Sequence, residues 1–66
     1  MFIFENRNSL NEVCFSSKLF DDMNEYDEIC NQFIEKSEKE GRLIADKDQI
    51  YFINLNTSEE IKVINW

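Results

Sequence analysis

The stretch DMNEYDEICNQFIEKSEKEG, residues 22–41, decides the fold of this chain. Apolar and small side chains recur in it at steps of three and four residues: Met23, Tyr26, Cys30, Phe33, Ile34 and Ser37, with Ile29 beside them. This spacing is typical of one face of an amphipathic helix. Asp22 is suited to cap the first turn, with Glu25 completing a capping-box pattern, and Gly41 is suited to end the helix in a left-handed conformation. The sequence therefore predicts a helix over residues 22–40.

Two segments upstream of the helix have the composition of β-strands. Residues 2–5 and 12–17 are rich in aromatic and β-branched side chains, and residues 6–9 between them (Asn-Arg-Asn-Ser) have turn chemistry. We expect the two strands to form a hairpin. Alternation along the second strand predicts that Val13 and Phe15 share one face.

The residues after the helix predict the rest of a sheet. Three short strands separated by polar turns are expected, the strands at 42–45, 49–55 and 60–66 and the turns at 46–48 and 56–59. The predicted fold class is α+β in the order ββ-α-βββ, a small antiparallel sheet with one amphipathic helix packed across it. At 66 residues we expect a single domain, residues 1–66, whose small core needs good packing or a partner to be stable.

The composition favours a folded acidic protein from an AT-rich genome. Hydrophobic residues make up 42% of the chain, with six Phe, and this content opposes the disorder that a net charge of −7 favours. Asn, Ile, Lys, Phe and Glu dominate while Gly and Pro are scarce, which indicates AT-rich coding, as in low-GC bacteria and their phages. Seven basic residues against fourteen acidic ones disfavour direct binding to nucleic acid, because the phosphate backbone repels an acidic surface.

Residue types for catalysis and metal binding are scarce. The chain has no histidine, so Cys14 lacks an imidazole to activate it, and there is no glycine-rich phosphate loop or serine-hydrolase motif. Asp46 and Asp48 are spaced like the first ligands of a calcium loop, but Tyr51 stands where that loop needs a glycine. We interpret the aspartates as part of a turn. No catalytic residue, no cofactor and no metal site is expected, and the chain is interpreted as non-enzymatic.

The cysteines and the hydrophobic runs indicate a cytoplasmic protein. The residues after Met1 do not have the hydrophobic core expected of a signal peptide. No apolar run reaches the roughly 18 residues of a membrane span. Cys14 and Cys30 form no C-x-x-C pair, and in the cytoplasm both thiols stay reduced. We expect Cys30 to be a small core residue and Cys14 to be a strand residue, with no membrane contact.

The first candidate binding surface is an acidic row along the helix. It follows steps of four and three residues: Asp21, Glu25, Glu28, Gln32 and Glu35. Such a row can imitate nucleic-acid phosphates and occupy a basic groove on a larger, nucleic-acid-binding protein. Its positions recur about every 5 Å of helix axis, whereas duplex DNA carries one charge per roughly 1.7 Å, so other carboxylates have to contribute. The alternative is a solvated face that keeps a small acidic protein soluble.

The second candidate surface is a face of the sheet. Alternation in the last two strands predicts Ile50, Phe52, Ile61 and Val63 on one face. The opposite face is expected to carry Tyr51, Ile53, Ile64 and Trp66, together with Leu55. One helix covers only one face, so the other leaves apolar and aromatic side chains for a partner or for a homodimer. The alternative is that the N-terminal strands curl over this face, as in a small barrel.

These surfaces lead to a binding hypothesis. We expect a small acidic inhibitor or modulator that occludes a site on a larger protein. A phage or mobile-element origin fits it, with an anti-defence, anti-CRISPR-like role in the host cytoplasm, by compositional analogy. One alternative is a homo-oligomeric structural or accessory protein that uses the exposed sheet face. Another is an antitoxin or immunity-type protein that uses the same acidic surface.

Overall fold

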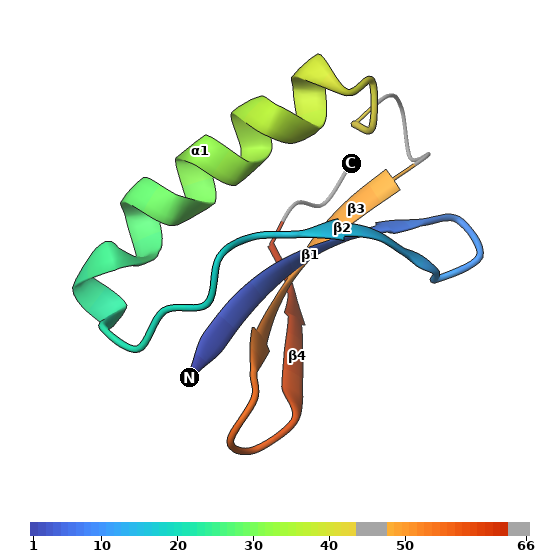
Figure 1. Ribbon diagram of the computed structural model, residues 1–66. Coiled ribbons are helices and arrows are strands. Elements are labelled where there is room, and N and C mark those ends of the chain that lie inside the picture. Colours follow the sequence, from blue (N-terminus) through green and yellow to red (C-terminus); the bar gives the residue numbers. More distant parts are fainter. Residues whose placement is uncertain (44–47, 64–66) are drawn as a thin grey trace.

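The structure, a computed structural model, describes residues 1–43 and 48–63 of the chain. Its elements follow in the order β1 (Phe2–Asn8), β2 (Val13–Ser16), the 3-10 helix η1 (Met23–Glu25), α1 (Tyr26–Lys39), β3 (Asp48–Asn54) and β4 (Glu59–Lys62). Figure 1 shows α1 lying across one face of a four-stranded antiparallel sheet. The predicted α+β class, one helix packed across a small antiparallel sheet, is therefore confirmed.

The sheet has the strand order β2-β1-β3-β4, with β1 and β3 in its centre. These two strands pair along their full length, from Phe2 opposite Asn54 to Asn8 opposite Asp48. Within the described residues, β2 and β4 are the edge strands. The central strands β1 and β3 are thus neighbours in one sheet although they are far apart in sequence. The helix α1 lies in the segment of chain that connects them.

The helix forms as the sequence predicts, with defined ends. Asp22 caps the first turn, because its Oδ1 accepts a hydrogen bond of 2.9 Å from the backbone N–H of Asn24. At the other end, Gly41 has a φ of 69°, and the N–H of Arg42 donates to the Ser37 carbonyl at 2.8 Å. This Schellman-type ending needs a left-handed residue, which glycine adopts without strain. The predicted helix is confirmed, with a first turn that is 3-10 rather than α, but among the described residues Glu25 forms no side-chain hydrogen bond that would complete the expected capping box.

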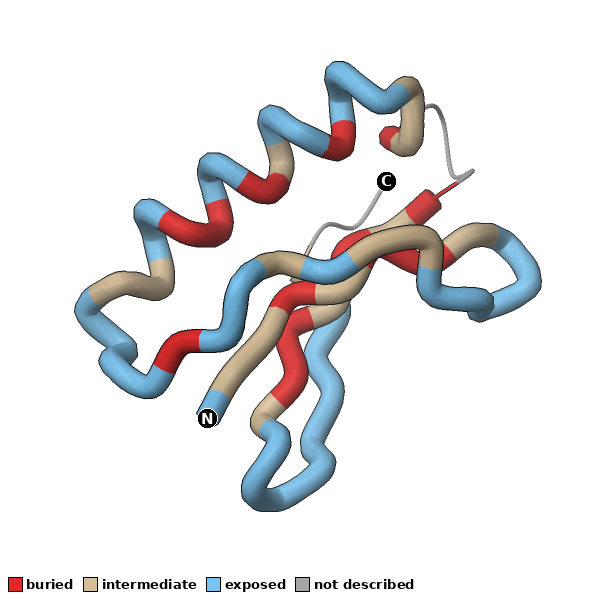
Figure 2. Tube along the Cα trace, viewed as in Figure 1, coloured by how far each residue is buried: buried red, intermediate tan, exposed pale blue. Residues whose placement is uncertain are grey.

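Aromatic side chains fill the space between α1 and the sheet. Phe4 on β1 is fully buried, and its ring centre lies 6.2 Å from that of Phe33 on α1 and 5.4 Å from that of Phe52 on β3. Phe20, before the helix, joins the same cluster and forms a β-bridge with Phe2. The buried side chains of α1 are Ile29, Cys30, Phe33 and Ser37. In Figure 2 the buried residues gather where α1 faces the central strands, which identifies this layer as the core.

The first hairpin is longer than the sequence predicts. Asn6 and Arg7, interpreted from the sequence as turn residues, continue β1, and both are buried. The pairing with β2 shifts its register between these two residues. Phe15 lies opposite Asn6 and Val13 lies opposite Arg7, so Phe15 and Val13 point to opposite faces of the sheet. The prediction that they share a face is wrong, because the bulge inserts Cys14 as an extra residue that simple alternation does not include.

The region after the helix also differs from its prediction. Arg42 and Leu43 belong to no strand, because the capping turn of α1 extends to Arg42, and Leu43 instead packs into the core. The other half of the strand predicted at 42–45 lies outside the described residues, as do residues 64–66. At the start of the helix, Met23 is 51% exposed rather than part of the apolar face.

Candidate binding surfaces

Arg7 organises the face of the sheet that points away from α1. Its Nη2 lies 2.8 Å from Glu5 Oε1 and 2.6 Å from Glu60 Oε2, and its Cζ lies 4.5 Å from the centre of the Tyr51 ring. Arg7 is 8% exposed, so these contacts compensate for the removal of its charge from water. The hydrogen bond between Arg7 and Glu60 is the main cause of a raised pKa for Arg7 and a lowered pKa for Glu60. We call these four residues the Arg7 cluster.

The Arg7 cluster bears directly on the predicted sheet surface. Tyr51 is half-buried beneath the guanidinium and Ile53 is 6% exposed, so little of either side chain is accessible to a partner. Leu55, expected on the same face, is 46% exposed in the turn after β3, and Ile64 and Trp66 lie outside the described residues. Among the described residues the sheet is not closed into a barrel, since β2 and β4 are its two edges and do not pair with each other. In the part of the chain that the structure describes, charge pairing dominates this face.

The acidic row lies on the solvent side of the helical region. Glu28, Gln32 and Glu35 are exposed on α1, Glu25 is half-buried at the end of η1, and Asp21 is exposed just before it. Gln32 Nε2 donates to Glu28 Oε1 at 3.4 Å, and Lys39 Nζ lies 3.2 Å from Glu35 Oε1. Exposed pairs of this kind contribute about 0–1 kcal/mol, so they do not hold the carboxylates firmly. The row is therefore accessible to a partner.

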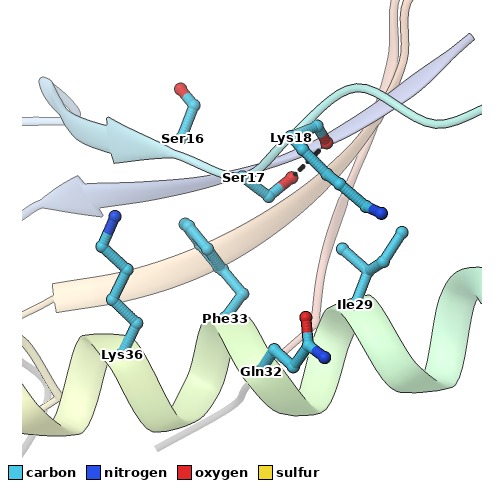
Figure 3. Close-up of a pocket in the computed structure, with 7 residues that line it drawn as sticks. All are labelled: Ser16, Ser17, Lys18, Ile29, Gln32, Phe33 and Lys36. Atoms are coloured by element: carbon cyan, nitrogen blue, oxygen red, sulfur yellow. Dashed lines mark hydrogen bonds between the residues drawn. The ribbon is translucent and has the colours of Figure 1, made fainter.

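A groove that the sequence does not indicate lies between β2 and α1, and Figure 3 shows its two walls. Its volume is about 250 Å³, and its lining residues are Ser16, Ser17 and Lys18 on one wall and Ile29, Gln32, Phe33 and Lys36 on the other. Ile29 and Phe33 are each 4% exposed and form an apolar floor. Lys18 and Lys36 are exposed, and neither forms an ion pair with another described residue. No local pattern signals this groove, because its walls meet only in the folded chain.

Other reactive chemistry is limited in the described part of the chain. Both cysteines are free thiols, with Cys14 half-buried in β2 and Cys30 in the core, as the sequence predicts. Burial, followed by the charge of Asp27, raises the pKa of Cys30, which keeps its thiol protonated. Across residues 1–43 and 48–63, no group of three or more His, Cys, Asp or Glu side chains is placed to hold a metal ion. No helix in these ranges is long and apolar enough to cross a membrane.

Comparison with protein-family models, with curated proteins and with solved structures finds no match to this chain. Function is therefore inferred from three features of the molecule itself: the acidic row, the Arg7 cluster and the groove between β2 and α1.

Proposed function

We propose that this protein binds a larger, basic protein through the acidic row of α1 and thereby inhibits or modulates it, without catalysing a reaction. The observation that carries the proposal is that the carboxylates of α1 are exposed, and only Lys39 among the described cations on α1 pairs with one of them. α1 is fixed to the sheet by a buried aromatic core, so the row is held as a unit. A partner with a basic surface can replace the water around these carboxylates without first breaking strong internal ion pairs.

A groove that binds nucleic acid is the kind of partner surface that fits the row. The 14-residue α1 is about 20 Å long, which equals about six base-pair steps of a duplex at roughly 3.4 Å each. Gln32 is neutral, so the four carboxylates of the row lie about 7 Å apart on average and supply about a quarter of the charge density of a duplex. Three further carboxylates are exposed on or directly after the helix, at Asp27, Glu38 and Glu40, and supply part of the remainder.

The setting that we propose is the cytoplasm of a bacterial host, with the protein encoded by a phage or mobile element and directed against a defence factor, as an anti-CRISPR protein is. The AT-rich coding that the composition indicates supports this setting, and two free thiols suit a reducing compartment. An antitoxin or immunity protein would use the same acidic surface on a different basic partner. A homodimer through the sheet face is less favoured, because Ile53 is buried and Tyr51 lies under Arg7.

The test compares two double variants of equal charge change. Glu28→Lys with Glu35→Lys reverses the centre of the acidic row, whereas Glu12→Lys with Glu59→Lys reverses two exposed carboxylates outside the helix. Each protein is immobilised, exposed to a bacterial lysate and washed at about 0.1 M and then about 1 M salt, between which the Debye length falls from roughly 10 Å to 3 Å. The captured proteins are identified by mass spectrometry, and thermal unfolding verifies that both variants are folded.

We expect the wild type to retain a nucleic-acid-binding protein at the lower salt concentration and to release it at the higher one. The helix variant should lose this protein and the control variant should keep it, because the proposal assigns the contact to α1. Equal capture by both variants would show that the row is only a solubilising surface. Recovery of the chain alone, together with a dimer by light scattering, would favour self-assembly instead.

A further inference from the structure

The groove between β2 and α1 exposes backbone groups that can pair with another strand. The Ser17 N–H donates to the Phe4 carbonyl at 2.8 Å, and bonded and non-bonded pairs alternate along an antiparallel ladder. Ser16, which lies opposite Glu5, therefore directs its own N–H and C=O away from β1. β2 is an edge of the sheet among the described residues, so no described strand pairs with these groups, and Ser16 is one of the residues that line the groove. An extended peptide can add to such an edge.

The side chains around this edge define what kind of peptide fits. Figure 3 shows Lys18 on the β2 side and Lys36 on α1, with Phe33 and Ile29 between the two walls. The Lys36 ammonium lies 5.1 Å from the centre of the Phe15 ring, a contact that leaves it free to pair with an anion. Gln32 adds an amide on the same wall. The groove thus combines a small apolar floor with two ammonium groups that form no ion pair with a described residue, on a protein whose net charge is −7.

We infer that this groove binds an acidic peptide segment in extended conformation, which adds to the edge of β2 beside α1. The α1 wall extends from Ile29 to Lys36, about 10 Å of helix axis, which matches three to four residues of extended chain at about 3.3 Å each. In this arrangement an apolar side chain of the added strand rests on Phe33, and its carboxylates pair with Lys18 on the β2 side and with Lys36 on α1. This site goes beyond the proposed function, since its charge is opposite to that of the acidic row.

The local charge outweighs the net charge at this site. The overall charge of −7 repels an acidic peptide at a distance, but the Debye length is about 8 Å at physiological ionic strength, so remote carboxylates are screened. Among the groove-lining residues the charged groups are the two ammonium groups, and the carboxylate of Glu28 is held outside the lining by the 3.4 Å hydrogen bond from Gln32. Lysines on an edge strand also discourage unwanted strand pairing, and this protective role is the competing explanation that the experiment has to separate from peptide binding.

The experiment is an NMR titration of the ¹⁵N-labelled full chain with three short peptides. The first is acetylated and amidated Glu-Val-Glu-Val-Glu, the second replaces each Glu by Lys, and the third is the acidic peptide with N-methylated backbone amides, which cannot pair with β2. We expect the acidic peptide to shift the amide signals of Ser16, Lys18, Gln32 and Lys36 with a Kd on the order of 1 mM. The basic and N-methylated peptides should produce at most a small fraction of these shifts.

Two variants with the same change in charge locate the binding. Lys36→Glu should weaken binding of the acidic peptide about tenfold, because it replaces an attractive charge in the groove by a repulsive one. Lys39→Glu, on the same helix but outside the groove lining, should change it less than twofold. The proposal is overturned by an absence of groove shifts at about 5 mM peptide. Equal shifts with the N-methylated peptide, or equal losses in both variants, overturn it as well. Concentration-dependent groove shifts without peptide would assign the edge to a second copy of the chain and also overturn it.

Discussion

Two charged regions of this molecule contain the same residue types and differ in how they are used. In the Arg7 cluster, an 8% exposed guanidinium holds two carboxylates at 2.8 and 2.6 Å. In the acidic row, the carboxylates of Glu28 and Glu35 are exposed, and their contacts are a 3.4 Å amide hydrogen bond and one pair with an exposed lysine. Charge within the Arg7 cluster is compensated inside the fold, whereas charge on α1 is left to solvent or to a partner.

The difference follows from position in the fold rather than from composition. Arg7 lies in the central strand β1, where burial makes an unpaired charge costly. α1 buries only the side that faces the sheet, so its carboxylates stay in water and need no internal cation. The comparison therefore predicts that the Arg7 cluster determines stability, and that the acidic row can be altered with little effect on the fold.

The largest effect is expected from Arg7→Met, which keeps much of the apolar side chain and removes the charge. Glu5, with 20% of its side chain exposed, and Glu60 then lose their cation, so the free energy of unfolding should fall by about 2–3 kcal/mol. This is less than the 3–5 kcal/mol typical of a fully buried pair, because the Glu60 side chain is 46% exposed. Urea unfolding measures the change.

The matched control for Arg7→Met is Glu28→Gln, which removes one charge from the acidic row. Among the described residues the Glu28 carboxylate accepts a single hydrogen bond, from Gln32 at 3.4 Å, so stability should change by less than about 0.5 kcal/mol. Equal losses of unfolding free energy in Arg7→Met and Glu28→Gln would contradict the inference that the Arg7 cluster stabilises the fold and the acidic row does not.

A smaller effect is expected at a neutral polar contact on the other side of the sheet. Asn6 Nδ2 donates to Ser37 Oγ at 3.2 Å, and both residues are fully buried. Ser37→Ala leaves this amide without its partner on α1, which should cost about 1–2 kcal/mol even though alanine favours helix. A double-mutant cycle with Asn6→Ala separates the contact from the individual residues. A coupling energy near zero would contradict a structural role for this hydrogen bond.

The sequence predicts those features that depend on local patterns. The helix has a repeat of three and four residues, an aspartate at its start and one glycine at its end, and each of these acts within a few neighbouring positions. The strands around Phe4 and Phe52 are likewise visible as runs of aromatic and β-branched residues. Local chemistry thus suffices for the α+β class and for the face of the helix that meets the sheet.

The features that the sequence misses depend on partners far along the chain. Asn6 and Arg7 resemble turn residues because nothing near them indicates that their side chains will donate hydrogen bonds to Ser37 and Glu60. The bulge at Cys14 is equally invisible, since alternation assumes one residue of β2 for each residue of β1. Candidate surfaces have the same limit. The acidic row can be read from helix spacing, whereas the groove requires the contact between β2 and α1.

The smallest and most specific effect is the pH dependence of the Arg7 cluster. The hydrogen bond from Arg7 lowers the pKa of Glu60 below its usual value of 4.5, so the folded state binds this proton less tightly than the unfolded state does. The contribution to stability is therefore present above about pH 4.5 and is lost as the pH falls through the lowered pKa. Glu60→Gln removes the titrating group. Its thermal midpoint should therefore fall less than that of the wild type between about pH 6 and about pH 3.

Arg7→Met provides the control for this pH dependence, because it removes the cause of the pKa shift and leaves the carboxylate in place. Its thermal midpoint should follow the flatter profile of Glu60→Gln rather than that of the wild type, although it starts from a lower value at neutral pH. Parallel profiles for all three proteins would mean that the ion pair does not persist in solution. In that case the contrast between compensated charge on the sheet and open charge on the helix would fail. A steeper wild-type profile that both variants flatten would confirm that the contrast is a property of the folded chain.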